Sequence, residues 1–223
     1  MNYTFLDNGI DSFKAAFEKI GALQERPYKS HDVKDAIIYM AHGMEILFKY
    51  LVSVRNYEDI FSNKTAYRLA EKKRIELGKD NVFQVKLERP LKTISLKDAF
   101  MLLTWGKYSL NHPETLLVVV EDLINRRNEI MHASIVLTDE ETAQLVEHLK
   151  FTYEELALFF IEHIENFEEL TKNFRFDKEA FEEELYFNWL QDMQADAAME
   201  AYKEGYYDQL ADEQEALEEF HKH

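Results

Sequence analysis

A long stripe of apolar side chains between residues 33 and 51 most constrains the fold of this chain. The stripe consists of Val33, Ala36, Ile37, Met40, Met44, Leu47, Phe48 and Leu51. Apolar residues three or four positions apart lie on one face of an α-helix, and this run is too long for a typical strand. The chain has only six Gly and three Pro in 223 residues, which argues against the many turns of a β-sandwich. We therefore predict an all-α protein with a central helix over residues 32–54.

Further helix signals lie on both sides of this central segment. Apolar spacing and capping signals predict helices over residues 11–23, 64–77, 95–108, 114–132 and 139–174. Ser95-Leu96-Lys97-Asp98 and Thr138-Asp139-Glu140-Glu141 each have the spacing of a capping box. Residues 82–87 alternate apolar and polar side chains, so we predict a short extended strand or hairpin arm there. One such piece does not change the predicted all-α class.

Acidic residues are concentrated at the C-terminal end of the chain. The net charge is −17, and residues 177–223 hold 15 Asp/Glu against 3 Lys/Arg. Apolar spacing in this segment predicts one or two acidic amphipathic helices. We therefore predict a helical bundle over residues 1–174 and an acidic helical extension over residues 175–223. The extension could pack on the bundle, cover a basic site as a nucleic-acid mimic, or bind a partner. A chain this acidic must bind any nucleic acid locally.

The sequence has no signal for a metal site, a cofactor or a membrane span. It contains no Cys, which excludes disulfides and thiolate ligands and fits a cytoplasmic protein. Its histidines lack metal-binding spacing with carboxylates. The first residues lack the basic start and apolar core of a signal peptide. The apolar run at residues 156–161 is far shorter than the about 20 residues that span a bilayer. We expect a cytoplasmic protein without a membrane, metal or cofactor.

Arg127 and His132 form the candidate catalytic pair, with Asn128 directly after the arginine. A guanidinium group offers a planar set of donors for two phosphate oxygens. An imidazole can accept or donate a proton near neutral pH. Asn128 could hydrogen-bond the phosphate or hold the imidazole tautomer. These groups suit phosphodiester cleavage. In the structural alternative, Arg127 favours the dipole of a helix C-terminus and His132 caps the helix.

Helix geometry limits how these groups can act together. Asn128 and His132 are four positions apart and lie on the same helix face. Arg127 and His132 are five positions apart and point roughly 140° away from each other on a regular helix. Either the helix ends inside the motif, or a second copy of the chain completes the site. We therefore predict that an active form is a homodimer.

The sequence resembles the HEPN family, helical-bundle proteins that act on nucleotides and RNA. The family motif is Arg, then about four to six residues, then His, often with a polar residue after the Arg. Arg127-Asn128-x3-His132 matches it, and Arg126 also satisfies the spacing. Residues 43–51 and 92–96 are similar to the second helix and to the segment before the motif-bearing helix of such proteins. The resemblance covers about residues 11–174.

The resemblance implies an up-down helical bundle that dimerises. In catalytic members it implies a metal-independent endoribonuclease, often a toxin or phage-defence effector, with Arg127, Asn128 and His132 at its site. RNA would be the substrate, and an antitoxin or a nucleotidyltransferase is a candidate partner. Arg126 and Glu45 are candidate supporting residues, with Glu45 either orienting the motif or serving as a buried partner of Arg or Lys. Lys49 is expected at the surface. The alternative is a non-catalytic module that binds a nucleotide or a protein partner.

Overall fold

The computed structural model describes residues 4–23, 29–132 and 137–176. The helices are α1 Phe5–Ala22, α2 Ser30–Arg55, α3 Lys64–Glu76, α4 Leu96–Thr104, α5 Glu114–His132, α6 Asp139–His163 and α7 Phe167–Thr171, with short 3-10 helices η1 Tyr57–Ile60 and η2 Val82–Gln84. These described ranges contain no strand, only an isolated bridge between Phe61 and Thr93. The prediction of an all-α helical bundle is confirmed. The acidic helices predicted beyond residue 176 lie outside the described residues.

α1 begins at Phe5, well before the predicted start at Asp11. A capping box starts it: the Thr4 hydroxyl accepts a hydrogen bond from the Asp7 amide, and the Asp7 carboxylate accepts one from the Thr4 amide, both at 3.1 Å. This exchange satisfies two amide groups that have no partner within the helix. The apolar spacing that predicts this helix begins only after Asp11, so the first turns of α1 were not predicted.

α2 lies at the centre of the bundle and packs most extensively against α1. All eight residues of its apolar stripe are buried, as predicted. The two backbones approach closely at Gly43, where a Cβ atom would lie only 3.0 Å from the amide nitrogen of Phe13. The Phe13 ring also stacks on Tyr153 of α6, with ring centroids 4.0 Å apart. These contacts join α1, α2 and α6 into one core.

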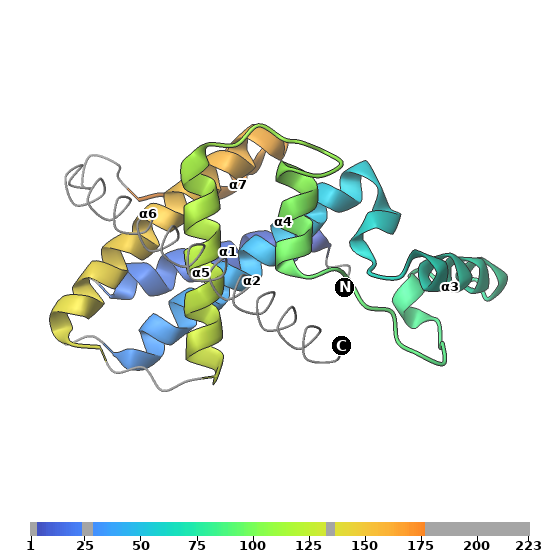
Figure 1. Ribbon diagram of the computed structural model, residues 1–223, viewed down its shortest axis with the longest axis horizontal. Coiled ribbons are helices and arrows are strands. Elements are labelled where there is room, and N and C mark those ends of the chain that lie inside the picture. Colours follow the sequence, from blue (N-terminus) through green and yellow to red (C-terminus); the bar gives the residue numbers. More distant parts are fainter. Residues whose placement is uncertain (1–3, 24–28, 133–136, 177–223) are drawn as a thin grey trace, which may run out of the picture. The chain divides into compact units, whose positions relative to one another are not determined.

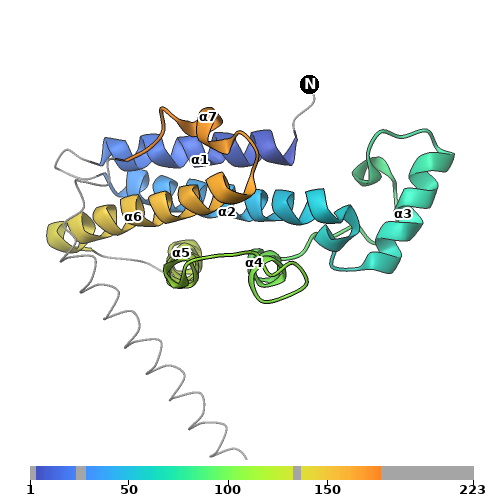
Figure 2. The ribbon, with the colours of Figure 1, turned by 90° about the horizontal axis from the view of Figure 1, so that it is seen from above.

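Within residues 4–176 the bundle has three layers (Figures 1 and 2). α1 and α7 lie on one side of α2 and α6, and α4 and α5 lie on the other side. α1, α2 and α6 run lengthwise together, as in an up-down bundle, whereas α4 and α5 lie across them. The buried stripe of α5 contains Leu116, Val119, Val120 and Leu123, and α5 contacts both α2 and α6. The motif-bearing helix is therefore fixed to the central layer by its first half.

The long helix predicted over residues 139–174 is wrong in its last part. α6 ends at His163, and Asn166 adopts a left-handed backbone conformation with φ of 60°. Asn tolerates this conformation better than most residues. The chain then forms α7, where Phe167 is buried and its ring lies 5.9 Å from that of Phe13. The apolar spacing continues across the break because Phe167 enters the same core from a new helix.

The extended strand predicted over residues 82–87 is also wrong. The segment begins with η2, and its buried residues are Val82 and Val85. A 3-10 turn places positions i and i+3 on one face, so these two valines share a contact surface. α4 starts at the predicted capping box of Ser95, but it ends at Thr104 rather than near residue 108.

Residues 62–92 form an excursion between η1 and α4, which we call the arm (Figure 1). Its two ends are joined: the Ser62 amide donates to the Lys92 carbonyl at 3.0 Å, and the Ile94 amide donates to the Ile60 carbonyl at 2.8 Å. The arm contains α3, which packs against η1 and η2. α3 ends at Glu76, close to the predicted end, and Gly78 follows in a left-handed conformation with φ of 61°. The arm is therefore a folded element with a closed base.

One segment of α2, His31–Arg55, is long and apolar enough to cross a membrane by length and composition. In this structure 56% of that apolar window is buried inside the bundle. α2 contacts α1, α4, α5 and α6. The apolar stripe of α2 thus has protein neighbours, as a central bundle helix requires.

Candidate functional site

The motif lies in the last turns of α5, which begins at the predicted Glu114 and stays helical to His132. The backbone therefore does not leave the helix inside the motif. Arg127 and His132 keep the separation of roughly 140° that a regular helix imposes. The side chain of His132 lies outside the described part of the structure. One chain thus presents Arg127 and the position of His132 on different sides of α5.

Arg127 and Asn128 are exposed, and neither side chain has a hydrogen-bond or ion-pair partner within residues 4–23, 29–132 and 137–176. Arg127 lies within roughly 40° of the stripe formed by Val120 and Leu123 on a regular helix. That stripe is buried, yet Arg127 is exposed and Met131, one turn further, is 53% exposed. In the described part of the chain, the cover over this stripe therefore does not extend to the end of α5. This end presents a cation and an amide that can bind a ligand.

Arg126, the other arginine that satisfies the motif spacing, is engaged inside the protein. Its Nε donates to the Asp122 carboxylate at 2.7 Å, one turn earlier on α5. Asp122 is buried, so loss of the guanidinium would leave a buried charge without this partner. The two neighbouring arginines therefore differ: Asp122 holds the Arg126 guanidinium, whereas the Arg127 guanidinium has no partner among the described residues.

His148 of α6 lies close enough to Arg126 for the guanidinium charge to act on it. Burial, with the Arg126 charge adding to it, lowers the pKa of His148 to about 4. The imidazole is therefore neutral at physiological pH. Spacing along the sequence does not reveal that α6 brings His148 beside the motif-bearing helix.

The lowered pKa of His148 predicts a loss of stability in acid. As the pH falls from the ordinary pKa of 6.5 toward about 4, the unfolded chain takes up a proton and the folded chain does not. Between about pH 7 and pH 4.5 we expect His148→Gln to lose about 2 kcal/mol less free energy of unfolding than wild type, measured by urea denaturation. Identical pH dependence of His148→Gln and wild type would contradict the lowered pKa of His148.

Glu45, the predicted supporting residue on α2, has a partner of its own. Its carboxylate accepts a hydrogen bond from Lys49 Nζ at 2.6 Å, and Lys49 also donates to Thr93 Oγ1 at 3.0 Å. Lys49 is only 5% exposed, so its predicted surface position is wrong. The segment that leads into α4 covers it. Of the two roles predicted for Glu45, this geometry favours the partner of a buried lysine.

A second group of polar side chains meets at Asp59. The buried carboxylate accepts hydrogen bonds from Lys64 Nζ at 2.5 Å, Lys107 Nζ at 2.6 Å and the Tyr108 hydroxyl at 2.6 Å. Burial opposes ionisation, but these three donors outweigh it and hold the pKa of Asp59 well below its usual range. Burial, with Asp59 adding, raises the pKa of Tyr108 to about 12. Because these groups bind one another, the cluster joins the base of the arm to the α4–α5 connection.

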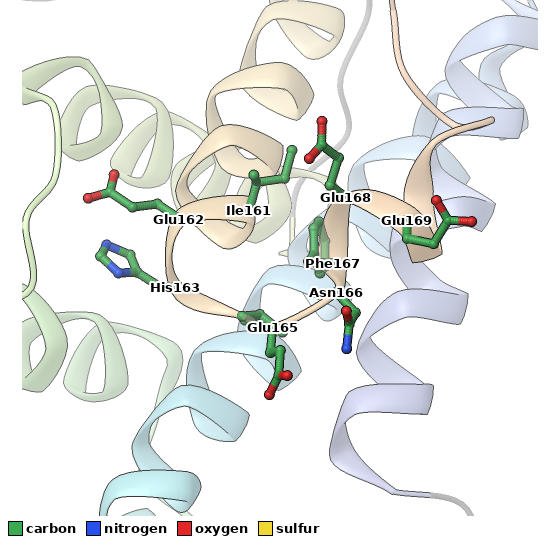
Figure 3. A pocket seen from close by; sticks show the side chains of 9 residues that line it. Ile161, Glu162, His163, Glu165, Asn166, Phe167, Glu168 and Glu169 are labelled. Carbon is green, nitrogen blue, oxygen red and sulfur yellow. The ribbon is translucent and has the colours of Figure 1, made fainter.

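A hollow of about 400 Å³ lies at the turn between α6 and α7 (Figure 3). It is lined by residues 161–169, which include four Glu. Glu162 and Glu169 point to opposite sides of the turn, so the carboxylates do not converge (Figure 3). His163 Nε2 is hydrogen-bonded to the Asn111 carbonyl at 2.8 Å. Among the described residues no group of three or more His, Cys, Asp or Glu could hold a metal ion. The hollow offers neither convergent ligands nor cations for phosphate.

Comparison of the chain with protein-family models, with curated proteins and with solved structures finds no match.

Proposed function

We propose that this chain is a metal-independent RNA endonuclease of the HEPN type, with Arg127, Asn128 and His132 at its site. The observation that carries this proposal is the exposed Arg127–Asn128 pair at the end of α5, with no partner in the described part of the chain, one turn before His132. Five of the seven described arginines are paired with a carboxylate or a backbone carbonyl, so Arg127 differs from most of them.

The proposed reaction uses the 2′-hydroxyl of the substrate as nucleophile. A base removes its proton while the 2′-oxygen–phosphorus bond forms, and an acid protonates the 5′-oxygen as its bond to phosphorus breaks. His132 would act as base or acid. The Arg127 guanidinium would bind two phosphate oxygens and stabilise the charge that develops on phosphorus. Asn128, on the His132 face of α5, would hydrogen-bond the phosphate or hold the imidazole tautomer.

A homodimer supplies what one regular helix lacks. Because α5 remains helical to His132, a single copy presents Arg127 and His132 on different sides. Two α5 ends that meet across a two-fold axis would bring Arg127 of one copy to His132 of the other. The exposed Met131 within the motif is an apolar side chain that such an interface would bury.

Incubation of the full chain with labelled RNA in EDTA tests the activity. We expect cleavage that leaves a 2′,3′-cyclic phosphate on one fragment and a 5′-hydroxyl on the other, because the 2′-oxygen attacks phosphorus and no metal takes part. DNA of the same sequence lacks the nucleophile and should remain intact. Cleavage only after addition of Mg²⁺, or equal cleavage of DNA, would contradict the proposed mechanism. A toxin or phage-defence effector, controlled by an antitoxin, is the role that fits this activity.

The second candidate function is a non-catalytic HEPN-like module that binds a nucleotide or a protein partner. The net charge of −17 favours it, because general attraction of RNA is absent. The two candidates differ in the EDTA assay: a binding module leaves all RNA intact, whereas the nuclease does not.

A further inference from the structure

The arm, residues 62–92, is a basic part of an acidic chain. It holds nine Lys/Arg against four Asp/Glu, a net charge of +5, while the rest of the chain carries −22. Three of these cations have carboxylate partners, in the pairs Lys64–Asp59, Arg68–Glu58 and Arg74–Glu71. The other six have no ion-pair partner among the described residues: Lys72, Lys73, Lys79, Lys86, Arg89 and Lys92. Cations without partners on one excursion favour binding of an anion.

The cations without partners lie along both parts of the arm. Lys72 is exposed on α3, roughly 160° around the helix from the buried Ala70. Lys86 and Arg89 are exposed on the return segment after η2. Between these parts Phe83 is 50% exposed, with its ring centroid 5.6 Å from that of Phe61. Cations spaced along the arm, together with an exposed aromatic ring on the same segment, suit an extended polyanion whose bases can stack.

The exposed aliphatic side chains of the arm do not form a docking stripe for a partner helix. Leu69, Ile75 and Leu77 are 50%, 65% and 61% exposed. On a regular helix they lie roughly 80° to 160° apart from one another. An acidic amphipathic partner helix would need apolar anchors on one face. Charge complementarity with phosphates therefore explains more of this surface than an apolar contact does.

We propose that the arm binds single-stranded RNA, with Lys72, Lys86 and Arg89 contacting phosphates and Phe83 stacking on a base. This inference rests on the proposed function, because the RNA held by the arm is the substrate cleaved at the end of α5. It gives an acidic chain a local surface for a polyanion. The Asp59 cluster fixes the base of this surface through Lys64.

The test measures RNA binding by the full chain carrying His132→Ala, which prevents cleavage. Anisotropy of a labelled single-stranded RNA of about 20 nucleotides is recorded at about 50 and 200 mM salt. In the same background, Lys72→Glu/Lys86→Glu/Arg89→Glu should weaken binding at least about 10-fold at low salt and reduce the salt dependence. Phe83→Ala should weaken binding by about 5-fold or more with the salt dependence unchanged.

The matched control is Lys29→Glu/Lys34→Glu/Lys97→Glu, which changes the net charge by the same amount outside the arm, at exposed lysines without an ion-pair partner among the described residues. It should bind RNA like the parent, and circular dichroism should show that both triple variants are folded. Equal losses in the two triple variants, or no loss in the arm variant, overturn the arm proposal.

The two proposals fail separately. Absence of RNA binding by the His132→Ala parent at both salt concentrations overturns the arm proposal and directs the search to an acidic protein partner. RNA binding that depends on the arm, without cleavage of RNA by wild type in EDTA, overturns the nuclease proposal alone. Cleavage by wild type with arm-independent binding overturns the arm proposal alone.

Discussion

Asp59→Ala is expected to lower the free energy of unfolding by about 3–5 kcal/mol, measured by urea denaturation. The Asp59 side chain is 2% exposed and accepts hydrogen bonds from Lys64, Lys107, Tyr108 and Asn56. The substitution removes all of these bonds at once. The two lysine side chains are each 53% exposed and can turn to water, but the Tyr108 hydroxyl and the Asn56 amide lose a charged acceptor at a covered position.

Glu71→Ala is the matched control for this effect. Glu71 also forms a carboxylate pair at the arm, with Arg74 at 2.7 and 2.8 Å, but the two side chains are 31% and 29% exposed. Water screens such a pair, so its loss should cost at most about 1 kcal/mol. A loss for Asp59→Ala no larger than that for Glu71→Ala would show that the Asp59 cluster does not hold the arm base.

Protonation of Asp59 at low pH should also lower the free energy of unfolding. The pKa of Asp59 is below its usual range in the folded chain, so its stabilising contribution is complete above the ordinary carboxyl pKa of 3.8. The contribution is lost as the pH falls from there toward the folded value. Protonation of Asp59 therefore lowers the free energy of unfolding at a lower pH than His148 does. The loss of stability from His148 lies between pH 6.5 and about 4.

Local sequence signals predicted the parts of the fold that depend on local chemistry. The apolar stripe of α2 and the capping boxes at Ser95 and Thr138 are present as predicted. The predictions of secondary structure were wrong where contacts between distant residues determine where a helix ends or which element forms. Phe167 continues the helical spacing although the chain turns at Asn166, because both sides of the turn pack into one core. Alternation at residues 82–87 predicted a strand, yet the segment forms η2, which packs against α3, and its buried residues are Val82 and Val85.

The same division applies to the candidate site. The motif spacing placed Arg127 and Asn128 on one helix end, and the structure adds that both are exposed there. The motif spacing alone could not show that Arg126 is paired and Arg127 is exposed. That difference depends on the contact of Arg126 with Asp122 and on which part of α5 is buried. The prediction that Lys49 lies at the surface was wrong, because Lys49 contacts Thr93, which is distant in sequence.

Arg127→Ala and His132→Ala should each reduce RNA cleavage by about 10²- to 10⁴-fold. Loss of His132 removes a proton-transfer group, and loss of Arg127 removes the charge that stabilises the transition state. Arg127 has no partner among the described residues, so Arg127→Ala should keep the stability of wild type. Arg126→Ala, which removes the Asp122 partner, should lower stability. Full activity of both Arg127→Ala and His132→Ala would show that the motif is structural.

Heterodimers separate a site shared between two chains from a site within one chain. When Arg127→Ala and His132→Ala chains are co-expressed with different tags and purified as mixed dimers, we expect about half of wild-type activity. One shared site then keeps Arg127 of one chain and His132 of the other. The matched control pairs a wild-type chain with an Arg127→Ala/His132→Ala chain.

In that control every shared site lacks one of the two groups, so a shared arrangement predicts almost no activity. A site complete within one chain predicts the opposite pattern: no activity in the first heterodimer and about half in the control, because the wild-type chain works alone. The regular path of α5 through the motif leads us to expect the first pattern. Both heterodimers carry the same substitutions in total, so their difference reports only how Arg127 and His132 are divided between the chains.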